Sequence, residues 1–269
     1  MSFSRTTRTV LLLLSGLVLL FIYAPLALVL LNSFNTSRTF EWPPTGYTTR
    51  WWAAAVENPG ARNAIVVSLE VAVVATAIAL VLGTMAALAL QRFRFFGRDT
   101  VSLLVILPIA LPGVVTGIAL ANAFLTIFGI ELGFFSLVVS HATFCMVTVF
   151  NNAIARLRRL GGNLEEASMD LGAGTFRTFW SVTLPMMRSA LLAGALLSFA
   201  LSFDEIIVTT FTAGSGVQTL PIWIYQNLFR PNQAPVVNVV AAALIVLSVI
   251  PIWLSQKLAG TDESVAAAR

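Results

Sequence analysis

The stretch NLEEASMDLGAGTFRTFWSVTLPMM, residues 163–187, interrupts a chain that otherwise consists mostly of long apolar runs. It contains three acidic residues, one arginine and a Gly-Ala-Gly turn sequence. The runs on both sides of it are long enough to enter a membrane, whereas this stretch is amphipathic. We therefore expect a water-facing loop between membrane helices, and the arrangement of the chain can be worked out from it.

The composition places the chain among integral membrane proteins. Hydrophobic residues make up 58% of its 269 residues and charged residues 10%, and the mean hydropathy is +0.88. So few polar side chains cannot coat a water-soluble globule of this size. The single cysteine, Cys145, lies in an apolar run, so it cannot form an intramolecular disulfide and is expected to be buried.

Six segments reach the roughly 20 apolar residues that a helix needs to cross a bilayer. They are residues 10–32, 63–90, 100–128, 134–155, 189–211 and 236–258. We therefore expect an all-α membrane protein with one transmembrane domain over residues 1–269. The first segment resembles a signal peptide in position, but its apolar run is too long and no small-x-small cleavage site follows. Pro108 and Pro112 are expected to kink the third helix.

The basic residues predict the topology, because cytosolic loops of membrane proteins hold an excess of Lys and Arg. Twelve of the sixteen lie on the side of the two termini and of the longest loop, residues 156–188. The other four are Arg38, Arg50, Arg62 and Arg230. Both termini and the 156–188 loop are therefore predicted to be cytosolic. The same asymmetry explains the pI near 10 without a nucleic-acid partner.

The local chemistry of this loop predicts two short helices and a corner. Asn163 can cap the first helix, and Glu166 can reach back to it as in a capping box. Gly172 and Gly174 supply the turn, where positive φ angles cost nothing for glycine. Thr175 can cap the second helix.

The second short helix is expected to run until Pro185, where the fifth membrane helix begins. The apolar side chains of the loop are Met169, Leu171, Phe176, Phe179 and Trp180. A knob that is apolar on one side is suited to a groove on a partner protein. The alternative is a helix–turn–helix that lies on the membrane surface.

A spaced motif in the loop narrows the class of protein. Glu166-Ala167-Ser168 is followed after three residues by Gly172 and, after nine more, by Val182-Thr183-Leu184-Pro185. The pattern resembles the Glu-Ala-Ala loop of permease subunits of bacterial ATP-binding-cassette importers, with Ser168 where a second Ala is usual. The resemblance implies a coupling helix that docks on the ATPase and includes Glu165, Glu166, Ala167, Ser168, Asp170, Gly172, Leu184 and Pro185.

The same resemblance implies the type I importer permease (MetI-like) fold and a set of partners. These are a homologous permease, two ATPase subunits and a periplasmic or extracellular substrate-binding protein. ATP and magnesium would bind to the ATPase subunits, and this chain would bind no cofactor.

Four further segments are similar to the second permease subunit of spermidine/putrescine importers, so the resemblance spans nearly the whole chain. They are residues 31–52, 132–157, 201–214 and 219–242. This implies a multi-pass protein of the bacterial inner membrane that carries a polyamine. Importers of γ-aminobutyrate, opines or aminoethylphosphonate remain as alternatives. The usual Ser-Leu-Asp-Asp of the family reads Ser202-Phe203-Asp204-Glu205 here, which retains the charge but does not fix the substrate.

Carboxylates inside the predicted spans are candidates for the substrate pathway. Asp204 lies about 22 Å along the fifth helix from Ser189, and Glu70 about 10 Å from the outer end of the second. Because a carboxylate in lipid is costly, each should face a watery cavity or a cationic partner. The pathway candidates are Phe203, Asp204, Glu205, Glu70, Trp223 and Tyr225. For Asp204 and Glu205 the alternatives are a structural pair with an Arg of the partner subunit or an interfacial position. For Glu70, a position at a subunit contact is favoured over a role in the pathway.

Other functional classes lack their sequence signatures. The sequence contains no Gly-Lys-Ser/Thr phosphate loop, so it supplies no ATPase site of its own. His141 is the only histidine, which disfavours a zinc site, and it is expected to be packed or hydrogen-bonded in a helix rather than to relay protons. A secondary transporter would show an inverted repeat, and a membrane enzyme would need a nucleophile–base pair. We therefore expect a transport subunit and not an enzyme.

Overall fold

The computed structural model describes residues 4–38 and 43–247. The chain divides into two compact units, one formed by Met1–Arg62 with Ile224–Arg269 and the other by Asn63–Trp223. In the described residues the secondary structure is helical, apart from one isolated bridge between Asn35 and Tyr47. The prediction of an all-α protein is confirmed.

The first unit contains α1 (Arg5–Asn32), α2 (Arg50–Glu57) and a helix over Ala234–Leu247. The N–H of Thr7 donates to the Ser4 hydroxyl, which caps α1 (3.1 Å). No side chain of α1 is buried in this chain. An apolar helix of 28 residues whose side chains are not buried by the rest of the chain is suited to contact with lipid or with another membrane subunit.

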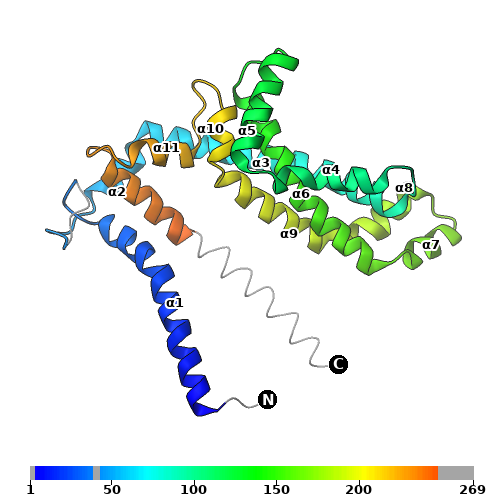
Figure 1. The fold of residues 1–269 in the computed structure, drawn as a ribbon, viewed down its shortest axis with the longest axis horizontal. Helices are drawn as coiled ribbons and strands as arrows, with labels where there is room; N and C mark the ends of the chain where they lie inside the picture. The colour runs from blue at the N-terminus through cyan, green and yellow to red at the C-terminus, as the bar shows by residue number, and fades with distance from the viewer. Residues whose placement is uncertain (1–3, 39–42, 248–269) are drawn as a thin grey trace. The chain divides into compact units, whose positions relative to one another are not determined.

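The second unit is built around α6. Its helices are α3 (Pro59–Arg92), α4 (Arg98–Ala110), α5 (Gly113–Asn122), the π-helical turn η1 (Ala123–Ile127), α6 (Phe134–Leu160), α7 (Asn163–Asp170), α8 (Thr175–Thr178), the π-helical turn η2 (Phe179–Thr183), α9 (Leu184–Phe203) and α10 (Ile207–Thr212). A last helix, α11 (Leu220–Asn227), crosses the boundary between the units. Figure 1 shows α6 and α9 side by side, with α4 also packed on α6.

Two glycines let the neighbours of α6 approach it closely. A Cβ on Gly83 of α3 would lie 2.8 Å from the Met146 carbonyl oxygen, and a Cβ on Gly194 of α9 would lie 3.3 Å from the Val149 Cα. Small residues at such contacts are the usual means by which membrane helices pack tightly. The core of this unit therefore lies along α6, and α9 and α10 pack directly on that helix.

Within residues 4–38 and 43–247, four helices are long and apolar enough to cross a membrane: Arg5–Asn32, Pro59–Arg92, Phe134–Leu160 and the continuous helix Thr175–Phe203. The predicted third span, 100–128, is instead two helices, α4 and α5 with η1, bent by 107°. Pro112 has a non-helical ψ of 133°, so the expected kink is a full break. The predicted sixth span, 236–258, overlaps Ala234–Leu247, and its remainder lies outside the described residues. The six-span count and the cytosolic termini stay predictions.

The prediction of a continuous fifth span over 189–211 is wrong at both ends. The helix already begins at Thr175 and passes through Pro185 without a corner. Pro185 lies directly after the π-helical turn η2, where the regular hydrogen-bond ladder of the helix is already interrupted, so its missing N–H is tolerated. At its other end the helix stops at Phe203, and residues 204–206 separate it from α10.

Candidate functional site

The turn between α7 and α8 is closed by its own backbone. Gly172 has a φ of 86°, the Gly172 N–H donates to the Met169 carbonyl (2.9 Å) and the Ala173 N–H donates to the Ser168 carbonyl (3.1 Å). This pair of bonds is the Schellman motif, which requires a left-handed residue after the helix and therefore favours glycine. The predicted role of Gly172 in the turn is confirmed. Gly174 has a φ of −67° and needs no such freedom.

The predicted side-chain caps of the two short helices are wrong by one residue. Gly162 and Gly174 occupy the N-cap positions, and neither helix has a side-chain cap. Asn163 and Thr175 are the first helical residues. The capping box expected between Asn163 and Glu166 is therefore not formed.

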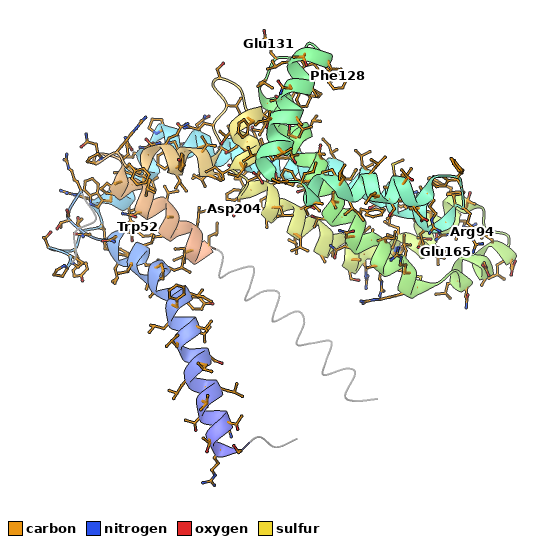
Figure 2. All side chains as sticks on the ribbon, viewed as in Figure 1. Trp52, Arg94, Phe128, Glu131, Glu165 and Asp204 are labelled. Atoms are coloured by element: carbon orange, nitrogen blue, oxygen red, sulfur yellow. The ribbon has the colours of Figure 1, made fainter. Side chains whose placement is uncertain are left out.

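Glu165 fixes α7 to two other elements of the second unit. Its carboxylate forms an ion pair with Arg92, the last residue of α3, and accepts a hydrogen bond from the Thr183 hydroxyl of η2. Only 7% of Glu165 is exposed. A charge buried to this degree is stable only with such partners. Figure 2 shows Glu165 at the α7 end of the unit, far along α9 from Asp204.

Sequence reasoning missed both partners of Glu165. Arg92 reads as one more basic residue of a cytosolic helix end, and Thr183 as part of an apolar helix. No signal in one sequence pairs a loop carboxylate with a residue more than 70 positions away. A second link that was missed joins the Ser168 and Thr178 hydroxyls, which lie 3.0 Å apart and connect α7 with α8.

The other predicted coupling residues lie on the outside of the loop or at the start of α9. Glu166, Ala167 and Asp170 are exposed on α7, whereas Leu184 is half-buried and Pro185 is exposed on α9. Apolar side chains are exposed beside them, with the exposed fractions Leu164 56%, Met169 41%, Leu171 90%, Phe176 76% and Trp180 54%. A loop with this many exposed apolar side chains is suited to contact with a protein partner or with the membrane surface.

The acidic pair lies in the break between α9 and α10, not inside a helix. Asp204 is the C-cap of α9, and its backbone N–H donates a hydrogen bond to the Ala200 carbonyl (3.1 Å). The Glu205 carboxylate accepts the Val208 N–H (2.8 Å) and so caps α10. Asp204 is exposed, and its carboxylate has no hydrogen bond or ion pair among the residues described. The prediction that both acids lie on one continuous fifth helix is therefore wrong, because α9 ends at Phe203 and α10 begins at Ile207.

The other pathway candidates differ in their exposure. Phe203 is half-buried and stacks on Phe199 (centroids 5.9 Å apart). Glu70 is exposed on α3. Trp223 is only 4% exposed, so its ring does not line an open pathway mouth in this structure, whereas Tyr225 is 64% exposed.

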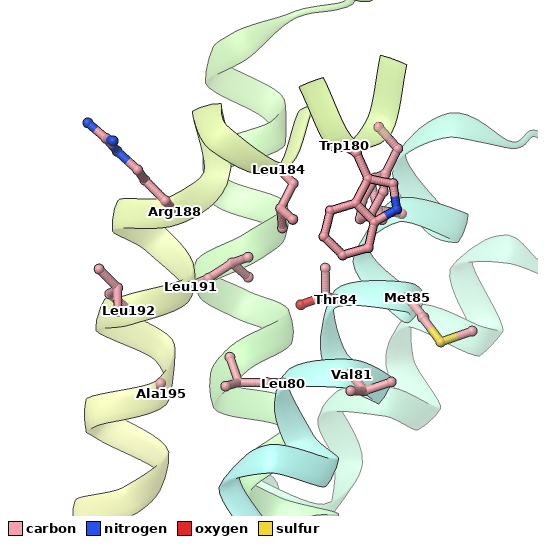
Figure 3. Close-up of a pocket in the computed structure, with 12 residues that line it drawn as sticks. Leu80, Val81, Thr84, Met85, Trp180, Leu184, Arg188, Leu191, Leu192 and Ala195 are labelled. Atoms are coloured by element: carbon pink, nitrogen blue, oxygen red, sulfur yellow. The ribbon is translucent and has the colours of Figure 1, made fainter. Parts of the chain in front are cut away.

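A groove of about 620 Å³ runs between α3, η2 and α9 (Figure 3). Its lining is apolar apart from Thr84 and Arg188; the other residues are Leu80, Val81, Met85, Leu88, Phe179, Trp180, Leu184, Leu191, Leu192 and Ala195. Arg188 would repel an ammonium group, and no carboxylate lines the groove. The groove is therefore a poor candidate for a cation pathway.

Comparison with known proteins identifies the family. The model of the family described as binding-protein-dependent transport system inner membrane component matches residues 79–259. The chain belongs to this family. It is 36% identical over 240 residues to the spermidine/putrescine transport system permease protein PotC of Escherichia coli (strain K12), which covers 89% of each chain. It is 34% identical over 232 residues to the putrescine transport system permease protein PotI of the same strain, which covers 84% of this chain and 82% of PotI.

Solved structures show the same fold. A bacterial ABC transporter involved in the import of the acidic polysaccharide alginate has a TM-score of 0.72 at 16% identity, covering 97% of this chain and 99% of that chain. The MetNI methionine ABC transporter has a TM-score of 0.58 at 18% identity, covering 78% and 97%. The predicted importer-permease fold is confirmed, and the chain is an inner-membrane transport component whose relatives are permeases.

Proposed function

We propose that this permease forms, with a homologous permease, the pathway of an ATP-driven importer for a polyamine of the putrescine and spermidine class. The observation that carries the substrate class is the 36% and 34% identity, over most of the chain, to permeases of spermidine and putrescine systems. Permeases for γ-aminobutyrate, opines or aminoethylphosphonate are the alternatives that the transport assay separates.

The loop from α7 to η2 is the proposed contact with the ATPase subunits, which would bind ATP and magnesium. Its exposed apolar residues and Glu166, Ala167 and Asp170 form the docking face. The buried Glu165 joins α7 to α3 through Arg92 and to η2 through Thr183. A push on α7 would therefore move two membrane helices, α3 and the helix that continues from η2 into α9.

The acidic break is the proposed contact with the amine, which a binding protein would deliver from outside. A polycation that sheds water needs fixed negative charge, and one carboxylate at ~4 Å supplies roughly 4 kcal/mol at an effective dielectric constant near 20. Glu205 already caps α10, whereas Asp204 is exposed and unpaired within the described part of the chain. Asp204 is therefore the first candidate for contact with an ammonium group, and Phe203, Glu70 and Tyr225 are secondary candidates.

The test is uptake by the complete importer in proteoliposomes, with the paired permease, the ATPase and the binding protein present. We expect ATP-dependent uptake of radiolabelled putrescine or spermidine. Asp204→Asn should lower it at least tenfold, a change of about 1.4 kcal/mol, with resting ATPase activity unchanged. Glu131→Gln, which alters an exposed carboxylate in another loop, is the matched control and should transport normally.

Two outcomes would contradict the proposal in different ways. Uptake of γ-aminobutyrate or aminoethylphosphonate, with no uptake of putrescine or spermidine, would show that the importer carries another amine. Normal uptake by both Asp204→Asn and Glu205→Gln would show that the two acids are structural.

A further inference from the structure

A buried histidine bridges the two helices that the acidic break separates. His141 of α6 is completely buried. Its Nδ1 lies 2.8 Å from the Ser202 hydroxyl in the last turn of α9, and its Nε2 lies 2.9 Å from the Thr209 hydroxyl in α10. One side chain thus joins both ends of the 204–206 break to the central helix of the unit.

The hydrogen-bond directions along this bridge determine the tautomer of His141. The Thr209 hydroxyl donates to the Glu205 carbonyl oxygen (2.9 Å), so it must accept from Nε2–H. Nδ1 then accepts from the Ser202 hydroxyl. Complete burial favours the neutral ring, and both of its nitrogens are then satisfied.

The residue types of the break do not by themselves require its shape. It contains neither glycine nor proline, and its residues Asp204, Glu205 and Ile206 all have negative φ angles. Two local bonds shape the break, from the Val208 N–H to the Glu205 carboxylate and from the Thr209 hydroxyl to the Glu205 carbonyl. The His141 bridge to Ser202 and Thr209 adds the tertiary link to α6.

The far end of α10 is tied to α6 as well. The Ser136 hydroxyl donates to the Thr212 carbonyl (2.8 Å). α10 also packs on α5, where Ile207 lies against Gly113 and Phe211 against Gly117. At the end of α10 that faces the break, His141 provides the hydrogen bond to α6.

We propose that His141 is a positioning residue, which fixes the angle of the 204–206 break and so directs the Asp204 carboxylate toward the amine. His141 itself does not touch the substrate. This inference rests on the proposed function, since it takes Asp204 as the group that meets the amine. It also gives a role to the imidazole that is buried inside α6.

The experiment compares three changes at the bridge with one matched control in the complete importer. His141→Leu removes both bonds, His141→Gln keeps one donor and one acceptor at similar reach, and Thr209→Val removes a single hydroxyl. Ser140→Ala is the control, because this buried neighbouring hydroxyl bonds only to the Ser136 carbonyl of its own helix. Two readouts are taken: the initial rate of radiolabelled putrescine uptake and the hydrogen exchange of amides 204–210.

His141→Leu should slow uptake at least tenfold and speed amide exchange at 204–210 at least fivefold. His141→Gln should retain most of the wild-type uptake rate and most of the wild-type protection from amide exchange. Ser140→Ala should behave as the wild type in both measurements. The double variant His141→Leu with Asp204→Asn should be no slower than Asp204→Asn alone, because one residue acts through the other. Should His141→Leu fail to assemble, Thr209→Val gives the same two readouts with a smaller change.

The outcomes separate this inference from the proposed function. Unchanged exchange in His141→Leu, normal uptake beside an impaired Asp204→Asn, or additive losses in the double variant would overturn the positioning role while leaving amine transport in place. Faster exchange in His141→Leu together with normal uptake in Asp204→Asn would support the control of the break by His141 and overturn the amine contact at Asp204.

Discussion

Two interruptions of the helices in the second unit are closed by different means. The turn at 171–174 between α7 and α8 is closed by local backbone bonds around Gly172, whose φ is 86°. The break at 204–206 has no glycine; it has local bonds at Glu205 and, in addition, a tertiary bridge from His141 of α6 to Ser202 and Thr209. The turn is therefore closed by neighbouring residues alone, whereas the break also has a bridge that forms only when α6, α9 and α10 pack together.

The largest effect is expected where α10 ends. Gly214 has a φ of 69°, and a Cβ there would lie 2.1 Å from the Leu132 carbonyl oxygen, so Gly214→Ala must move the backbone. We expect a loss of about 3 kcal/mol or more in stability. Gly216 has a φ of 89° but open space around it, so Gly216→Ala should cost only about 1–2 kcal/mol. Thermal unfolding of the purified complex measures both, and equal losses would contradict the steric argument.

The next effect separates two adjacent carboxylates of α7. Glu165→Ala leaves Arg92 and Thr183 without their partner, and an unsatisfied buried group costs about 1–3 kcal/mol. Glu166 is exposed, so Glu166→Ala should leave the melting temperature unchanged but reduce the stimulation of ATPase activity by loaded binding protein. A melting temperature that falls equally in both variants would show that Glu165 has no special structural role.

A smaller effect is expected at the locally coded turn. Gly172→Ala forces a Cβ into the left-handed region and should cost about 1–2 kcal/mol, although nothing lies within 4 Å of that Cβ. Gly174→Ala is the matched control, because its φ is −67° and its surroundings are equally open. Binding of the ATPase subunit to the variant permease should weaken only in Gly172→Ala. If the two variants bind alike, the Schellman turn does not set the docking face.

Features with local determinants can be predicted from this sequence, whereas features that depend on tertiary contacts cannot. Gly172 could be placed in the turn because only glycine readily supplies its φ. The caps were missed by one residue, since Gly162 and Gly174 take the N-cap positions with no side-chain signal. The break at 204–206 reads as a continuing helix because its flanks are apolar and it lacks glycine and proline. The bridge from His141 to its two flanks cannot be seen without α6 packed against α9 and α10.

Cysteine labelling tests the predicted topology, and the cysteine substitutions themselves should not alter transport. Cysteines introduced at Arg94 and Arg177 should react with a membrane-impermeant maleimide only from the cytosol, and those at Arg50 and Arg230 only from outside. The native Cys145 is buried and should not react with the maleimide. Reversed labelling would overturn the charge-based topology and the cytosolic position of α7.

The most direct test of the central claim is photo-crosslinking from the loop between α7 and α8. A benzophenone side chain in place of Leu171, which is 90% exposed, should crosslink to the ATPase subunit in the assembled importer. The same group in place of Phe128, exposed at the tip of η1 in Figure 2, should not. Crosslinks from position 171 to lipid alone would contradict the account, because they would place α7 on the membrane surface rather than on the ATPase.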